Sequence, residues 1–195
     1  MKTTMMMLFL ALVSWGANAQ MDHSMKGMDD MKPKMADKST VPTSIKIEHS
    51  LTVSAILNNY LALKNALVED NARNAANSGK MLFDALGKFN LSGQAASKQK
   101  DLKDILDDAK ENAEHISKSG GDIDHQREHF EMLSTDIRDL IVITGADRNL
   151  YQIYCPMFNN KKGGKWLSEF QDIKNPLFGS KMLKCGSIVQ EITVK

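Results

Sequence analysis

The chain has 195 residues, 42% of them hydrophobic, and a formal net charge of +1. The balanced charge argues against nucleic-acid binding and against electrostatic docking on a membrane surface. With only two cysteines the chain is not a disulfide-dense miniature, so an apolar core must stabilise the fold.

The first nineteen residues have the pattern of a secretory signal peptide. Lys2 precedes an apolar run from Met5 to Val13, and the small-x-small cleavage pattern Ala17-Asn18-Ala19 follows. The apolar run is too short for a stable membrane anchor. We therefore expect cleavage after Ala19, a periplasmic or secreted location, and no membrane insertion of the mature chain.

Residues 20–47 form a predicted disordered tail rich in methionine and histidine. The segment has no aromatic or branched apolar residue before Val41, so it cannot bury enough surface to offset its ordering entropy. A solvated linker or a helical methionine stripe is the alternative interpretation. Methionine is a poor exposed spacer because it oxidises. We expect transient capture of a soft metal by the residues Met21, His23, Met25, Met28, Met31 and Met35.

A single domain is predicted over residues 48–195, and it begins with four amphipathic segments. Apolar residues recur at three- and four-residue steps in about 48–68, 73–89, 94–117 and 122–145. Gly120-Gly121 stops the third segment, and Asp122 caps the fourth. Short turns between the segments predict a mainly α fold, an antiparallel four-helix bundle.

From about residue 150 the pattern predicts a small, partly β C-terminal cap. Residues 151–157 are expected to be extended, because Pro156 disfavours helical backbone at Cys155. Ser187–Val194 alternates in polarity as a final strand. Both cysteines lie within this cap.

Each cysteine has a methionine at a spacing that favours a shared face. Cys155 and Met157 are two apart in an expected strand, and Met182 and Cys185 are three apart, which one helical turn would align. Thiolate and thioether are soft donors that suit copper, with Cu(I) favoured. The four residues therefore predict a metal site. Zinc stays open if histidine and cysteine dominate the ligand set.

A Cys155–Cys185 disulfide is an equally open interpretation of the same residues. The two methionines would then fill the core. A loop of this length would stabilise the fold by roughly 3–4 kcal/mol. The mirrored methionines favour the metal modestly.

Two histidines add to the predicted metal site. His125 and His129 are four residues apart near the start of the fourth helix, so they share a helical face. Imidazoles at this spacing commonly bind metal. His115 ends the third helix, close in sequence to the turn that leads to them. A lone histidine is more often solvated or capping, whereas a pair beside a sulfur cluster favours His125 or His129 as a further ligand.

No enzyme motif is found. The sequence lacks a Gly-rich phosphate loop, Gly-x-Ser-x-Gly, His-Glu-x-x-His and Cys-x-x-Cys. We therefore predict that the protein is not an enzyme. A thiol enzyme with Cys155 as nucleophile is the remote alternative, because nothing marks an oxyanion hole.

Several motifs together resemble a domain family of unknown function in exported proteins of Bacteroidetes. They are the runs 121–130, 155–157, 166–168, 173–176 and 182–186, and the resemblance spans about Ser50 to Val189. Members occur alone or fused to periplasmic adaptor subunits of copper/silver-type heavy-metal efflux pumps. Leu177 and Phe158 depart from the family pattern. The resemblance implies a helical domain with a metal-associated role, and its signature residues fall on His125, His129, Cys155, Met157, Met182 and Cys185.

The main hypothesis is a soluble periplasmic copper-binding chaperone or buffer linked to metal efflux or homeostasis. Its partners would be the metal ion and a periplasmic efflux adaptor protein. The alternative is a disulfide-stapled helical interaction module of the cell envelope that needs no metal.

Overall fold

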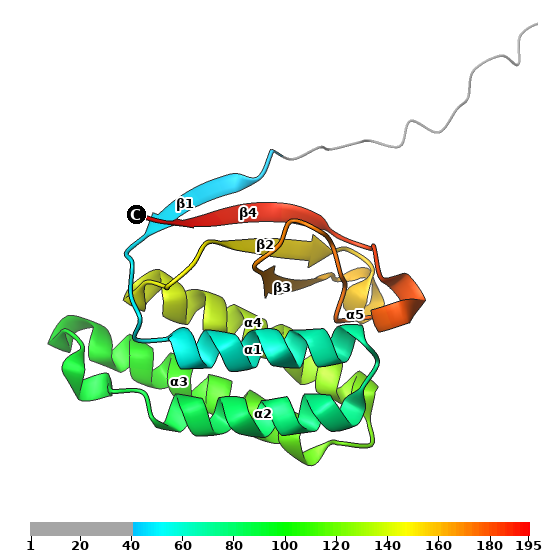
Figure 1. The fold of residues 1–195 in the computed structure, drawn as a ribbon, viewed down its shortest axis with the longest axis horizontal. Coiled ribbons are helices and arrows are strands. Elements are labelled where there is room, and N and C mark those ends of the chain that lie inside the picture. The colour runs from blue at the N-terminus through cyan, green and yellow to red at the C-terminus, as the bar shows by residue number, and fades with distance from the viewer. Residues whose placement is uncertain (1–40) are drawn as a thin grey trace, which may run out of the picture. The chain divides into compact units, whose positions relative to one another are not determined.

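The computed structural model of the protein describes residues 41–195 (Figure 1). The predicted signal peptide and the tail residues Met21 to Met35 lie outside the described residues. Helices are labelled α, 3-10 helices η and strands β. The elements in chain order are β1 (Thr43–Ile47), α1 (Ser54–Val68), α2 (Ala72–Gly87), η1 (Leu91–Gly93), α3 (Ala96–Lys118), α4 (Ile123–Thr144), β2 (Leu150–Cys155), α5 (Phe158–Lys161), β3 (Gly164–Ser168), η2 (Gly179–Met182) and β4 (Ser187–Val194).

The long helices lie close to where the apolar pattern predicts them, so the mainly helical fold class is confirmed. Each of α1 to α3 packs against the next helix along the chain. The carboxylate of Asp122 accepts the backbone N–H of His125, as expected for the cap of α4. The antiparallel order of the bundle stays a prediction.

One four-stranded sheet covers the helices, in the order β1-β4-β2-β3. β4 runs antiparallel to β2 and parallel to β1, where Ile45 pairs with Ile192. The predicted tail was expected to run to residue 47, but it must end before Thr43 because β1 is part of the sheet. The alternation of Ile45 and Ile47 with Ser44 and Lys46 is too short to identify a strand without its distant partner.

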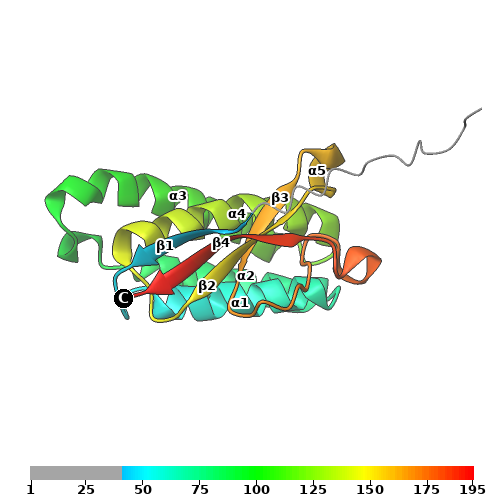
Figure 2. The same cartoon turned by 90° about the horizontal axis from the view of Figure 1, so that it is seen from above.

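The helices form two layers beneath the sheet. α1 and α4 lie next to the sheet, and α2 and α3 lie on their far side (Figures 1 and 2). The core runs continuously through the helices and the sheet, and Tyr60, Phe130 and Trp166 are among its fully buried side chains.

Tyr60 joins α1, α4 and β3 through its buried hydroxyl. Ser134 gives its own proton to the Phe130 carbonyl, so Tyr60 donates to Ser134 Oγ over 2.8 Å. The Tyr60 oxygen in turn accepts the backbone N–H of Leu167 at 2.9 Å. Burial, the largest effect, raises the pKa of Tyr60, so the hydroxyl stays protonated.

A second buried polar group, Arg127, fastens the segment before η2 to the helices. Its guanidinium donates to the carbonyls of Pro176 and Leu67 at 2.9 and 3.1 Å and also bonds to Asp70 and Asp124. Arg127 is only 2% exposed, so these bonds replace its lost hydration. In the part of the chain that the structure describes, no helix combines the length and apolar character needed to cross a membrane.

Candidate metal centre

Three histidines gather where α3 ends and α4 begins. His125 and His129 occupy successive turns of α4, and His115 lies in the last turn of α3. The connection between the helices is short, and Ser119 tightens it by donating its hydroxyl to the His115 carbonyl at 2.8 Å. The cap by Asp122 fixes the start of α4 on the other side of the turn. The turn therefore brings the end of α3 against the face that carries His125 and His129.

The three rings are close enough to share one ion. One ring nitrogen from each histidine lies within 4.8 Å of the corresponding atoms of the other two. The His115 and His129 rings stack at 4.4 Å and 11°, and His125 meets His129 edge-on at 4.6 Å. Nitrogen ligands at about 2.0–2.1 Å from a tetrahedral ion are roughly 3.4 Å apart. Small rotations of the rings would therefore close the set around a metal.

The surroundings of the cluster favour neutral imidazole at His129. Burial is the largest cause that lowers the pKa of His129, and the neighbouring charges of His115 and His125 lower it further. His129 Nδ1 lies 2.9 Å from Asn112 Oδ1. The Glu128 carboxylate lies 3.8 Å from His125 Nδ1. A neutral ring keeps the lone pair that a metal requires.

His115 and Asn112 are the parts of this centre that the sequence did not predict as functional. His115 is exposed, whereas His125 and His129 are half-buried. The sequence gives one indication of a role for His115: it precedes His125 by ten residues, and a Gly-Gly turn lies between them. Asn112 carries no sequence signal, because only the packing of α3 on α4 brings it to His129.

The two predicted cysteines also lie together, but apart from the histidine cluster. Cys155 ends β2, Cys185 follows η2, and their sulfur atoms are 2.6 Å apart. Neither cysteine belongs to the histidine cluster. Both are free thiols, Cys155 fully buried and Cys185 half-buried. Burial, with the Cys155 thiol, raises the pKa of Cys185 to about 11, so its thiol is protonated at neutral pH.

Of the two methionines, Met157 does not follow the spacing that was expected of it, whereas Met182 and Cys185 are joined by one turn, in which Cys185 N–H donates to the Met182 carbonyl at 3.0 Å. Met157 has α-helical backbone angles, φ −87° and ψ −17°, so the extended segment ends before it. Its side chain is 41% exposed, whereas Cys155 is fully buried, and the two side chains do not share one face. The backbone N–H of Met157 is directed at the Cys185 thiol. Met182 ends η2 and is half-buried.

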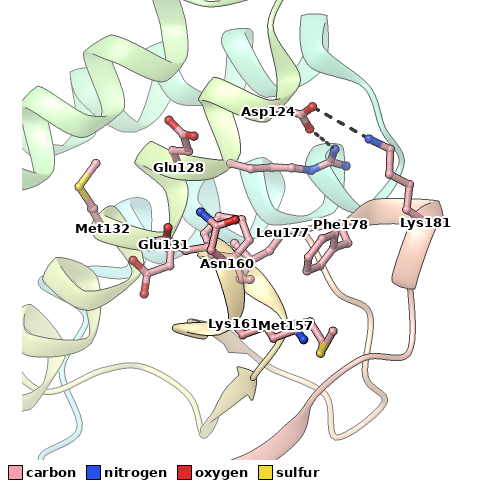
Figure 3. Close-up of a pocket in the computed structure, with 13 residues that line it drawn as sticks. Asp124, Glu128, Glu131, Met132, Met157, Asn160, Lys161, Leu177, Phe178 and Lys181 are labelled. Atoms are coloured by element: carbon pink, nitrogen blue, oxygen red, sulfur yellow. Dashed lines mark hydrogen bonds and ion pairs between the residues drawn. The ribbon is translucent and has the colours of Figure 1, made fainter. Parts of the chain in front are cut away.

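Met157 instead lines a cavity of about 810 Å³ between α4, α5 and the segment that ends in η2. Met132 of α4 lies on the opposite side of this cavity (Figure 3). At the rim of the cavity, the carboxylate of Asp124 forms ion pairs with both Arg127 and Lys181. The residues that line the cavity include no histidine and no cysteine. The histidine and cysteine candidates and the cavity are therefore separate features.

Comparison with known proteins finds one family model that matches the helical part of the chain. Residues 56–149 match the family model described as "Protein of unknown function (DUF3347)", which supports a family of unknown function. No curated protein and no solved structure matches the chain. The matched residues include all three histidines of the cluster, whereas both cysteines follow them in the sequence.

Proposed function

We propose that the protein binds a transition-metal ion, copper in the first place, and buffers it or passes it on. The observation that carries this proposal is the approach of the ring nitrogens of His115, His125 and His129 to within 4.8 Å. Imidazole suits copper, zinc and nickel. For a given nitrogen site, affinity is generally highest for Cu(II). Zinc is the alternative ion. The set of three imidazoles also widens the expected oxidation state from Cu(I) to include Cu(II).

The form of the centre supports exchange of the ion rather than a fixed structural role. Structural zinc sites use four protein ligands, whereas a three-ligand site leaves a coordination position open. His115 is exposed, so an acceptor protein can approach the ion from that side. The proposal has three further parts. The protein is exported to the periplasm, its methionine tail captures the metal ion, and it delivers the ion to an efflux adaptor. These three parts rest on the N-terminal sequence and the family resemblance.

Cys155 and Cys185 are proposed as a second soft-metal site, independent of the histidines. The sulfur atoms are already adjacent, but they must move apart to hold a Cu(I) ion between them. Met182 remains a proposed ligand because one turn separates it from Cys185, whereas Met157 does not share a face with Cys155. Two sites of different chemistry would let the protein hold copper in either oxidation state.

A competition titration tests the histidine centre. The full chain is titrated with Cu(II) and with Zn(II) against a chelating competitor. We expect one equivalent to be lost in the His125→Ala and His129→Ala variants and retained in His49→Ala, which removes an exposed histidine outside the cluster. Equal affinity in all variants would reject the centre. Loss of binding only in Cys155→Ser with Cys185→Ser would move the site to the sulfur pair.

The second candidate function is the disulfide-stapled interaction module, and the 2.6 Å separation of the two sulfur atoms favours it. A thiol count on denatured, metal-free protein taken directly from its compartment separates the two functions. Two reactive thiols support the metal function of the pair. No reactive thiol supports the stapled module and removes the cysteines from the metal proposal.

A further inference from the structure

Asn112 of α3 lies between two functional groups of α4, His129 and Asp136. Its Oδ1 is 2.9 Å from His129 Nδ1, and its Nδ2 is 3.1 Å from Asp136 Oδ2. We propose that Asn112 is a positioning residue that fixes the tautomer of His129, with the proton on Nδ1 and the lone pair of Nε2 free for a metal. This inference deepens the proposed metal function and rests on it for its biological meaning.

The hydrogen bonds of Asn112 decide which way its amide faces. Nδ2 has two acceptors, the Asp108 carbonyl at 3.1 Å and the Asp136 carboxylate at 3.1 Å. Neither group can donate a proton while the carboxylate is ionised. A flipped amide would set its oxygen against both acceptors and its NH₂ against His129. The amide oxygen therefore faces His129.

The direction of the amide determines the proton on the ring. An amide oxygen only accepts hydrogen bonds, so the Nδ1 atom of His129 must be the donor. A neutral ring with its proton on Nδ1 has its lone pair on Nε2. This is the arrangement in which metal-binding histidines bond one ring nitrogen to an outer oxygen and the other to the ion.

Asp136 supports Asn112 from the neighbouring turns of α4. His129 and Asp136 are seven residues apart, so they lie on one side of the helix and both reach Asn112. Asp136 therefore holds the amide from the side opposite His129. The hydrogen-bonded series Asp136–Asn112–His129 orients the imidazole of His129. The charged carboxylate of Asp136 is separated from the ion by the neutral amide of Asn112.

Nitrogen NMR of the histidine rings in the metal-free full chain tests the inference without any metal. The wild-type spectrum is expected to show His129 mainly as the Nδ1–H tautomer. Asn112→Ala should shift the population toward Nε2–H. The double variant Asn112→Asp with Asp136→Asn keeps an acceptor oxygen beside His129 and one amide donor between residues 112 and 136, so it should restore the Nδ1–H tautomer. Asn77→Ala, at an exposed position of α2, is the matched control. A His129 ring that is mainly Nε2–H in the wild type overturns the inference.

Metal affinity provides the second readout. Loss of an outer hydrogen bond to a ligand typically weakens metal binding about 10–100-fold. We expect this loss for Asn112→Ala and recovery for the double variant Asn112→Asp with Asp136→Asn. A tautomer that depends on Asn112 in a protein that binds no metal supports the inference and rejects the proposed function. Metal binding at the histidines with a tautomer indifferent to Asn112 rejects the inference alone.

Discussion

The rings of His115 and His129 lie parallel, 4.4 Å apart, although they come from two helices joined by a turn. Protonation of both rings would place two positive charges in contact. A charge on His115 therefore opposes the protonation of His129, which contributes to the lowered pKa of His129. The stack favours the neutral form of His129, and neutral imidazole is the form that binds metal.

Removal of His115 should affect both the metal and the remaining rings. His115→Ala deletes one ligand, so we expect weaker Cu(II) binding. In the metal-free protein it also removes one of the charges that lower the pKa of His129, so this pKa should rise toward its ordinary value of 6.5. An NMR pH titration measures the second effect. An unchanged pKa of His129, with His49→Ala as the reference, would contradict the electrostatic contact.

Asp136 gives a pH-dependent effect on stability. Burial is the largest cause that raises its pKa from 3.8 to about 6, and the charges of Asp108, Asp139 and Glu131 add to it. The folded state therefore binds this proton more tightly than the unfolded state. The resulting stability is fully present below about pH 4 and is lost as the pH rises through about 6.

Asp136→Asn should remove this pH dependence. The amide oxygen can still accept from Asn112, but it does not ionise. We expect the variant to have a higher melting temperature than the wild type near pH 8, and a difference close to zero near pH 4. A variant that melts lower than the wild type near pH 8 would show that the ionised carboxylate is stabilising.

The hydroxyl of Tyr60 should contribute measurably to stability. Tyr60→Phe leaves the buried N–H of Leu167 without its acceptor. An unsatisfied buried donor costs about 1–3 kcal/mol of unfolding free energy. Urea denaturation checks this value. Tyr151→Phe is the matched control, because its hydroxyl bonds to Gln171 at the surface. Equal losses in the two variants would argue against a special role for the buried hydroxyl.

Arg127 should be among the most sensitive positions in the helical domain. Arg127→Met keeps much of the side-chain volume but leaves Asp70 and the carbonyls of Pro176 and Leu67 without their donor. Each buried carbonyl left without its donor costs about 1–3 kcal/mol, whereas the carboxylate of Asp70 is partly exposed and adds little because water reaches it. We expect the loss in urea denaturation and little change for Arg73→Met, at an exposed position of α2. A loss below about 1 kcal/mol would contradict the account of this bond network.

Asp70 adds a check on the acid side of the same network. The Ser180 side chain, followed by the Arg127 guanidinium, contributes to a pKa of Asp70 lowered to about 2. The folded state thus releases this proton more readily than the unfolded state. The stability that Asp70 contributes is present above about pH 4 and is lost as the pH falls through about 2. Asp70→Asn should therefore destabilise the protein at neutral pH and much less near pH 2.

Sequence patterns between neighbouring residues predicted most helices and strands correctly, but they did not predict which of these elements pack together. The periodicity of apolar residues predicted α1 to α4, and alternation predicted β4 over Ser187–Val194, because both patterns depend on neighbouring residues. β1 was missed because its partner lies at the other end of the chain. Three successive left-handed residues, Asn159 to Lys161, redirect the chain just after Met157. Asparagine tolerates this backbone, but the sequence alone does not locate the turn.

The candidate site was predicted in part for the same reason. His125 and His129 share a face by helical spacing alone, which the sequence displays. Their meeting with His115 depends on how α3 packs against α4. We expected the histidines and the cysteines to form one metal site. That expectation joined two separate sequence patterns, and neither pattern indicates that the two groups lie together. The structure assigns them to two separate places.

X-ray absorption spectroscopy of the full chain loaded with one equivalent of Cu(II) tests the central claim most directly, because it identifies the atoms bound to the ion. We predict a nitrogen-dominated shell with the outer scattering of imidazole rings, which weakens in His129→Ala and persists in Cys155→Ser. A shell dominated by sulfur, or one unchanged by His129→Ala, would contradict a metal centre at His115, His125 and His129.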